Sequence, residues 1–173
     1  MPHPPPFLDL PPEHTAYEGS RVVVLPVPLE RTTSYGKGTA EGPAAILRAS
    51  TQVELYEEQT RSDPFRLGIA TLPPFPCGDG EMRDLLAGLE AEAARHLRAG
   101  KLLVSLGGEH SLTLGPLRAA LAVHGTLGVV QFDAHADLRP EYEGSPFSHA
   151  CIMSRVVELA LPTVAVGIRA LSR

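Results

Sequence analysis

The sequence predicts an α/β fold built around a mainly parallel sheet. Short apolar runs that are typical of buried strands alternate with longer amphipathic stretches that are typical of helices. One of the runs, residues 127–132, ends in Asp133, His135 and Asp137, three polar side chains at every second position. Because ligands in open α/β sheets bind beyond the carboxyl ends of the strands, we expect a metal site there.

The composition is that of one globular domain. A chain of 173 residues can bury a sizeable core, and its net charge of -5 includes no block of basic residues. We therefore expect no nucleic acid as a partner, and no membrane, since no apolar run approaches the length of a membrane span. Cys77 and Cys151 are too few for a disulfide framework, which indicates a cytoplasmic protein with reduced thiols.

The chain is expected to begin with a proline-rich arm, residues 1–20, that lies over the surface or against a neighbouring subunit. Its prolines exclude a regular helix or a central strand. Residues 21–25 contain the β-branched run Val22-Val23-Val24, and they predict a buried strand that Pro26 and Pro28 stop. Residues 30–38 form a polar, glycine-bearing loop after this strand, a position that often carries function.

Four further elements are expected before residue 100. Gly42-Pro43 opens a helix through about residue 50, with proline at the favoured first position. Residues 52–56 are a candidate for a short strand and residues 65–70 for a second buried strand. Residues 81–99 predict a long helix, because its leucines repeat every four residues along one apolar stripe.

The second half of the chain continues the alternation of strand and helix. Residues 101–106 predict a buried strand that runs into Gly107 and Gly108, which let the backbone turn sharply. A helix with Pro116 near its start ends at Gly125. The remaining expected elements are the strand 127–132, the helix 148–159 and the strand 163–166, within a domain that covers residues 21–173.

Two consecutive strands therefore end in residues that can bind a metal. His110 follows the first strand, and Asp133, His135 and Asp137 follow the second. Consecutive parallel strands are often neighbours, so these side chains are expected in one crevice. Two imidazoles and two carboxylates suit a divalent ion such as Mn, Fe, Ni or Zn, and several close carboxylates favour more than one ion. Taken singly, an Asp or His at a strand end is most often a helix cap or a satisfied polar group.

Other polar residues near these motifs are given simpler roles. Glu109 is expected to support the metal site without binding the ion. His96 and His124 are expected at the surface, near helix ends. Cys151 follows His149, which could suggest a Cys/His nucleophile pair, but its apolar neighbours favour a buried helix residue.

Three motifs give the chain a resemblance to the ureohydrolase family, which contains arginases and agmatinases. They are Gly107-Gly108-Glu109-His110-Ser111, Asp133-Ala134-His135-Ala136-Asp137 and Tyr142-Glu143-Gly144-Ser145-Pro146-Phe147-Ser148-His149. The third motif looks more like agmatinases than arginases. The resemblance covers nearly the whole chain after the arm. It implies an arginase-like, three-layer α/β/α fold that is incomplete at its carboxyl-terminal side.

The resemblance implies hydrolysis of agmatine, or of a related alkylguanidine, to urea and an amine. It also implies two Mn²⁺ ions per active site and a metal-bridged hydroxide that attacks the guanidinium carbon. By this resemblance His110 and Asp137 bind one ion, His135 binds the other, and Asp133 bridges them.

Three more residues and an assembly state are carried over from the resemblance. His149 matches the family histidine that shuttles protons, which suits a reaction whose departing amine must be protonated. Glu141 and Glu143 are candidates for receiving the small cationic guanidinium substrate, with a solvated loop as the alternative. Ureohydrolases are commonly trimers or hexamers, so a homo-oligomer is expected.

Two parts of the family's active site are missing from the sequence. The other metal ligands of its members come from a later Asp-x-Asp motif, and a further Glu binds the guanidinium; neither occurs before Arg173. We therefore expect the isolated chain to have little or no activity.

Several alternatives stay open at this point. From a different class, a catalytically incomplete metal-binding or scaffold protein would explain the same motifs. Within the class, the substrate could be guanidinobutyrate, formiminoglutamate or aminopropylagmatine. A nucleotide-binding domain has little support, because no glycine fingerprint follows the first strand.

Overall fold

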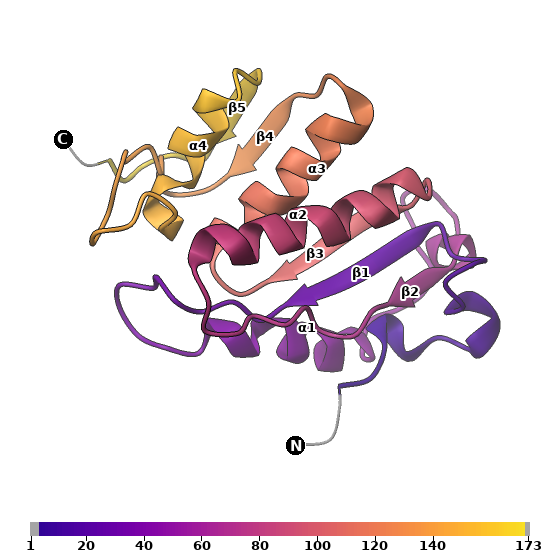
Figure 1. Cartoon of the computed structure of the whole chain (residues 1–173). Coiled ribbons are helices and arrows are strands. Elements are labelled where there is room, and N and C mark those ends of the chain that lie inside the picture. Colours follow the sequence, from indigo (N-terminus) through magenta and orange to yellow (C-terminus); the bar gives the residue numbers. More distant parts are fainter. Residues whose placement is uncertain (1–3, 172–173) are drawn as a thin grey trace. The chain divides into compact units, whose positions relative to one another are not determined.

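A computed structural model of the chain describes residues 4–171 (Figure 1). The first residues of the expected arm, 1–3, and the last residues of the expected domain, 172–173, lie outside this part. The chain divides into two compact units. Unit 1 consists of Met1–Glu30, Lys37–Cys77 and Arg95–Gly108, and unit 2 consists of Arg31–Gly36, Gly78–Ala94 and Glu109–Arg173.

Unit 1 is built on a three-stranded parallel sheet with the order β2-β1-β3. The strands are β1 (Val22–Val27), β2 (Ile69–Thr71) and β3 (Leu102–Gly107). The β-branched run of β1 lies in the centre, and Val22 pairs with Ile69 on one side and with Leu102 on the other. The parallel sheet that the sequence predicts is therefore present in unit 1.

The first strand does not stop at Pro26 as predicted; β1 continues through Pro26 to Val27 and ends directly before Pro28, the other predicted stop. The carbonyl of Pro26 accepts a hydrogen bond from the N–H of Phe75 at 2.8 Å, on the side of the sheet where β2 lies. Because β2 ends at Thr71, the N–H that proline lacks would have had no strand partner there.

The described part of the arm packs into the core of unit 1. It forms two short 3₁₀ turns, Phe7–Asp9 and Pro12–His14. The N–H of Leu8 donates to Oγ of Ser50, the last residue of α1 (Gly42–Ser50), at 2.8 Å. Leu10 joins a buried cluster with Val24, Leu47 and Ile69.

The candidate strand at residues 52–56 is wrong. This segment is a turn that continues from the end of α1, with the N–H of Gln52 donating to the carbonyl of Ala49 at 3.0 Å. The following turn is closed by the Glu57 carboxylate, which accepts from two backbone N–H groups, so local bonds replace a strand partner. The second strand also begins later than predicted, because Pro64–Leu67 is a 3₁₀ helix before β2.

His96 is buried, so its predicted surface position is wrong. It lies on the last turn of α2 (Met82–Arg98), in the part of this helix that belongs to unit 1. Nδ1 of His96 is 2.9 Å from the hydroxyl of Tyr17, in the segment after the arm's second turn. This partner of the buried imidazole is 79 residues away, which helix periodicity does not reveal.

Unit 2 contains a parallel pair of strands, β4 (Val129–Phe132) and β5 (Thr163–Val166). Its helices are the first part of α2, α3 (Leu114–His124) and α4 (Ile152–Glu158). A Cβ at Gly115 of α3 would lie 3.0 Å from the carbonyl oxygen of Leu86, so the glycine allows α2 and α3 to pack closely. Although β3 and β4 follow each other along the chain, they belong to different sheets in the described residues.

The β4–β5 pair leaves apolar side chains exposed. They come from both strands and are Val130, Phe132, Val164 and Val166. No helix in the described part of the chain combines the length and the apolar character that crossing a membrane would require.

Candidate metal centre

Three of the four predicted metal ligands lie together in unit 2. Nδ1 of His110 is 2.9 Å from Oδ2 of Asp137 and 3.5 Å from Oδ2 of Asp133. One ligand atom from each of the three residues lies within 4.8 Å of the other two. One imidazole and two carboxylates, all only partly buried, are a donor set that suits a divalent ion such as Mn²⁺ or Zn²⁺.

Two of these three side chains come from the ends of regular elements, and Asp137 comes from the irregular segment after β4. His110 begins the 3₁₀ helix His110–Thr113, which leads directly into α3. Asp133 follows the last residue of β4, and Asp137 has a φ of 50°. A positive φ is uncommon outside glycine, although aspartate tolerates it better than most residues, and such conformations cluster at functional sites. Asp133 and Asp137 therefore lie beyond the end of β4, not on the strand itself.

The Asp133 carboxylate is held in its charged form. Burial acts to raise its pKa, but the N–H of His135, which donates to Oδ1 at 2.8 Å, and the charge at His110 outweigh this, so the pKa lies below its ordinary value. The buried Gln131 contributes as well, and its amide also donates to the carbonyl of His135 at 3.2 Å. The sequence reasoning did not single out Gln131, whose only signal is a polar residue inside an apolar strand.

His135 lies beside the group rather than in it. Its Nδ1 is 3.5 Å from Oδ1 of Asp133, and 67% of its side chain is exposed. Beyond the ends of β4 and β5, His135 forms an isolated parallel bridge with Ala170. The structure thus brings His110, Asp133 and Asp137 together and leaves His135 at their edge.

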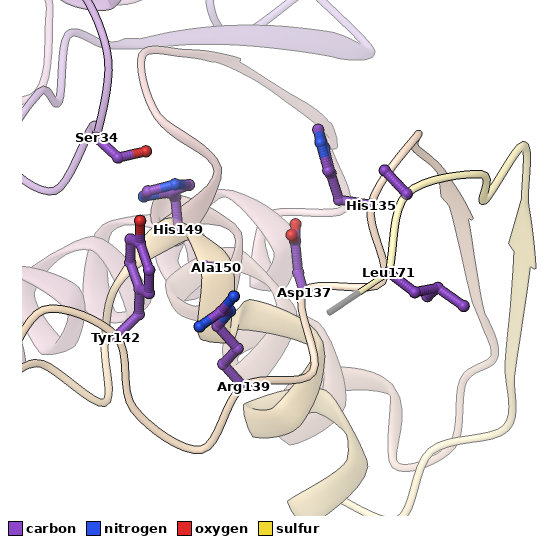
Figure 2. Close-up of a pocket in the computed structure, with 9 residues that line it drawn as sticks. Ser34, His135, Asp137, Arg139, Tyr142, His149, Ala150 and Leu171 are labelled. Carbon is purple, nitrogen blue, oxygen red and sulfur yellow. The ribbon is translucent and has the colours of Figure 1, made fainter. Parts of the chain in front are cut away.

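A pocket of about 360 Å³ adjoins these residues within unit 2 (Figure 2). Three of the predicted site residues line it: His135, Asp137 and His149. The other lining residues are Ser34, Arg139, Tyr142, Ala150, Ala170 and Leu171. Glu141 and Glu143 are exposed and are not among the lining residues, whereas Tyr142 between them is.

The Tyr142 side chain orients the predicted proton-shuttle histidine. Its ring meets that of His149 edge to face, with the centroids 5.8 Å apart and the planes at 87°. The guanidinium carbon of Arg139 lies 4.9 Å from the centroid of the Tyr142 ring. Sequence reasoning missed both pocket residues as site members, although Tyr142 stands in the motif that ends at His149.

Glu109 is buried, and the group of His110, Asp133 and Asp137 does not include it. Its Oε2 accepts the backbone N–H groups of Arg31 at 2.6 Å and Thr32 at 2.7 Å. Its Oε1 accepts the hydroxyls of Thr32, at 2.8 Å, and Ser111. Burial acts to raise the pKa of Glu109, but these hydrogen bonds outweigh it and the pKa lies below its ordinary value.

His149 contacts Thr32, the loop residue that also donates to Glu109. It begins the 3₁₀ helix His149–Cys151, and its backbone N–H donates to Oγ1 of Thr32 at 3.0 Å. Its Nδ1 is 3.3 Å from Oγ1 of Thr32 and 3.3 Å from Oγ of Ser148. Thr32 was missed as an individual residue, but it lies in the polar loop after the first strand that the sequence marked as functional.

Cys151 is fully buried, which confirms its prediction as a buried residue. It ends the short 3₁₀ helix and directly precedes α4, rather than lying within that helix as predicted. Burial raises the pKa of its thiol, and a thiol that stays protonated is a poor nucleophile.

The sequence model of the Arginase family matches residues 20–173 of this chain. The N(1)-aminopropylagmatine ureohydrolase of Synechocystis sp. is 43% identical, over 91% of this chain and 53% of the relative. The enzyme of the same name from Thermus thermophilus is 42% identical, over 92% of this chain and 54% of the relative. The chain thus spans about half the length of the curated relatives it matches.

The comparison with solved structures agrees with the family match. The agmatine ureohydrolase of Thermoplasma volcanium superimposes with a TM-score of 0.84 and 31% identity, covering 92% of this chain and 54% of that one. The fold of the described residues is therefore that of these enzymes, over about half of their length.

Proposed function

The chain belongs to the arginase family, and we propose that it supplies part of the active site of a ureohydrolase that converts a guanidinium group to urea and an amine. The observation that carries this proposal is the grouping of His110, Asp133 and Asp137 next to a pocket that His149 also lines. A metal group and a candidate proton carrier on one pocket are the elements that hydrolysis of a carbon–nitrogen bond requires.

The proposed substrate is an alkylguanidine, either agmatine or N(1)-aminopropylagmatine. The two curated relatives carry the second name, and the solved structure from Thermoplasma volcanium carries the first. Glu141 and Glu143 stay candidates for attracting the cationic substrate, from the exposed turn beside the pocket rather than from its lining. A trimer or hexamer and a cytoplasmic location also stay predictions from the sequence.

The donor set fits part of the coordination of the two Mn²⁺ ions that the resemblance implies, because the family's later Asp-x-Asp ligands do not occur before Arg173. His110 and Asp137 would hold one ion and His135 the other, with Asp133 shared, since Asp133 lies within 3.5 Å of both imidazoles. Bound ions would supply Lewis acidity and lower the pKa of water to near neutrality. The depressed pKa of Asp133 keeps this carboxylate ready to bind without first losing a proton.

The chain's own residues would then bind the substrate and move protons. The pocket of about 360 Å³ excludes part of the solvent around the reacting group. His149 holds and delivers the proton that the departing amine nitrogen requires. Tyr142, packed against the His149 ring, keeps the imidazole plane fixed relative to the pocket.

A substrate panel tests the proposal. Agmatine, N(1)-aminopropylagmatine, guanidinobutyrate and formiminoglutamate are incubated with Mn²⁺ and either the 173-residue chain or the product of its complete gene. We expect little or no urea from the 173-residue chain and urea from the complete gene product with one of the first two substrates. Formamide instead of urea would assign formiminoglutamate, and robust urea release by the 173-residue chain would contradict the proposal that it holds only part of the site.

A catalytically incomplete metal-binding protein is the second candidate. The observation that favours it is that only three ligands group together in the described residues, while His135 is largely exposed. Mn²⁺ binding by the complete gene product, without hydrolysis of any substrate in the panel, would establish this candidate instead.

A further inference from the structure

We propose that Thr32 is a positioning residue that fixes the His149 imidazole in its Nδ1–H form and leaves Nε2 with the free lone pair. The catalytic use of this arrangement rests on the function proposed above for His149. The form of the imidazole itself does not, because it follows from hydrogen-bond accounting at Glu109, Thr32 and His149, all in unit 2.

The buried carboxylate of Glu109 determines which way the Thr32 hydroxyl points its hydrogen. Its two oxygens receive two backbone N–H groups, from Arg31 and Thr32, and two hydroxyls, from Thr32 and Ser111. A carboxylate that accepts four such donors is stabilised in its charged form. A charged carboxylate has no hydrogen to give, so in the contact with Oγ1 of Thr32 at 2.8 Å the threonine is the donor.

The single hydrogen of the Thr32 hydroxyl is therefore donated to Oε1 of Glu109. A hydroxyl oxygen has two remaining acceptor sites, and the backbone N–H of His149 fills one of them at 3.0 Å. Nδ1 of His149 approaches the same oxygen at 3.3 Å. Because Oγ1 can only accept in this contact, Nδ1 has to carry the hydrogen.

The neighbouring hydroxyl of Ser148 is compatible with this form. Its Oγ is also 3.3 Å from Nδ1 of His149, and the Ser148 residue is buried. With a hydrogen on Nδ1, both hydroxyl oxygens are acceptors that face a donor. With a bare Nδ1, Ser148 could donate, but the lone pair of Nδ1 would then face the lone pair of Thr32. The Nδ1–H form satisfies both contacts.

The consequence is a defined proton path at one atom. A neutral imidazole with hydrogen on Nδ1 takes up at Nε2 a proton from the water consumed in the hydrolysis, and the imidazolium gives the same proton to the departing amine nitrogen. The ring returns to its starting form, and the proton count balances. The contacts of Thr32 and Tyr142 hold the ring in place throughout, which reduces the reorganisation that each transfer requires.

The test is a measurement of the His149 ring form by long-range ¹H–¹⁵N NMR. The 173-residue chain is labelled on histidine and freed of metal with a chelator, and the His149 signals are assigned from their loss in H149Q. Three variants are compared with the wild type. Thr32→Val keeps the shape of the side chain without its hydroxyl, Thr32→Ser keeps the hydroxyl, and Ser111→Ala removes a different donor from Glu109.

We expect the Nδ1–H pattern in the wild-type chain, in Thr32→Ser and in Ser111→Ala, and mainly the Nε2–H pattern in Thr32→Val. An Nε2–H wild type, or an unchanged pattern in Thr32→Val, would overturn the proposal. If Thr32→Val does not fold, as judged by protection of the α4 amides from exchange, Thr32→Ala replaces it, and an Nε2–H pattern in Thr32→Ser also overturns the proposal.

A kinetic arm separates this inference from the proposed function. In the complete gene product, Thr32→Val should lower kcat for urea release at least about tenfold with little change in KM, and Thr32→Ser should restore it. Absence of urea release from the wild type would refute the proposed function, while the NMR result on the Thr32 contact would stand. An unchanged kcat in Thr32→Val would overturn the positioning role.

Discussion

Nδ1 of His110 lies 2.9 Å from Oδ2 of Asp137, across 27 residues of sequence, and Asp133 completes the group. The two contacting atoms converge on the region that a cation would occupy. Asp137 has a φ of 50°, a conformation that costs backbone energy and that clusters at functional sites.

The first prediction concerns metal binding. Asp137→Ala should weaken Mn²⁺ binding by the 173-residue chain at least about tenfold, or about 1.4 kcal/mol, because it removes a carboxylate from the three-ligand group. His135→Ala should weaken it less, since His135 lies at the edge of the group and is largely exposed. Titration calorimetry measures both. Asp84→Ala, at an exposed position on α2, is the matched control. Equal losses in Asp137→Ala and Asp84→Ala would show that the group does not bind the ion.

The second prediction concerns the buried carboxylate. Glu109→Gln should lower the free energy of unfolding by about 2–3 kcal/mol. In the wild type both carboxylate oxygens of Glu109 accept hydrogen bonds, whereas in the variant an amide nitrogen, itself a donor, replaces one of these acceptors. Urea denaturation at neutral pH, with chelator present so that metal binding does not contribute, gives the value. Glu58→Gln makes the same chemical change at an exposed site and should alter stability by less than about 0.5 kcal/mol. A Glu109→Gln protein as stable as Glu58→Gln would contradict the hydrogen bonds described here.

Local elements and the ligand residues were largely predictable from sequence. Helix α1 has the predicted bounds, and so does β5, because proline at a helix start and β-branched runs are local signals. His110 and Asp137 lie together as predicted, although β3 and β4, which were expected to be neighbouring strands, belong to different sheets in the described residues.

What sequence could not supply depends on distant partners. Burial of His96 requires the Tyr17 hydroxyl 79 residues away, and the role of Thr32 requires His149, which is 117 residues away. Continuation of β1 through Pro26 depends on where β2 happens to end. Hydrophobic periodicity contains no information on such pairings, since each is set by tertiary packing rather than by neighbours along the chain.

The third prediction concerns Gly108, directly before the metal-binding motif. A Cβ at this position would lie 2.2 Å from the carbonyl oxygen of Leu29, so the glycine is required by a close approach of backbone rather than by the sharp turn that the sequence suggested. Gly108→Ala should therefore lower the free energy of unfolding by at least about 1–3 kcal/mol. Gly78→Ala is the control, because nothing lies within 4 Å of its added Cβ. Thermal denaturation compares the two, and equal midpoints would contradict the close approach at Gly108.

The fourth prediction concerns the arm. Leu10 is 7% exposed and packs with Val24 and Leu47, so Leu10→Ala should cost about 2–4 kcal/mol in the free energy of unfolding through lost burial and the cavity left behind. Leu67→Ala removes the same atoms where the side chain is 50% exposed and should cost clearly less. Urea denaturation of both variants measures the difference. If the two costs were equal, the arm would not be part of the core of unit 1, and the sequence-based expectation of an arm that lies over the surface or against a neighbouring subunit would be the better description of these residues.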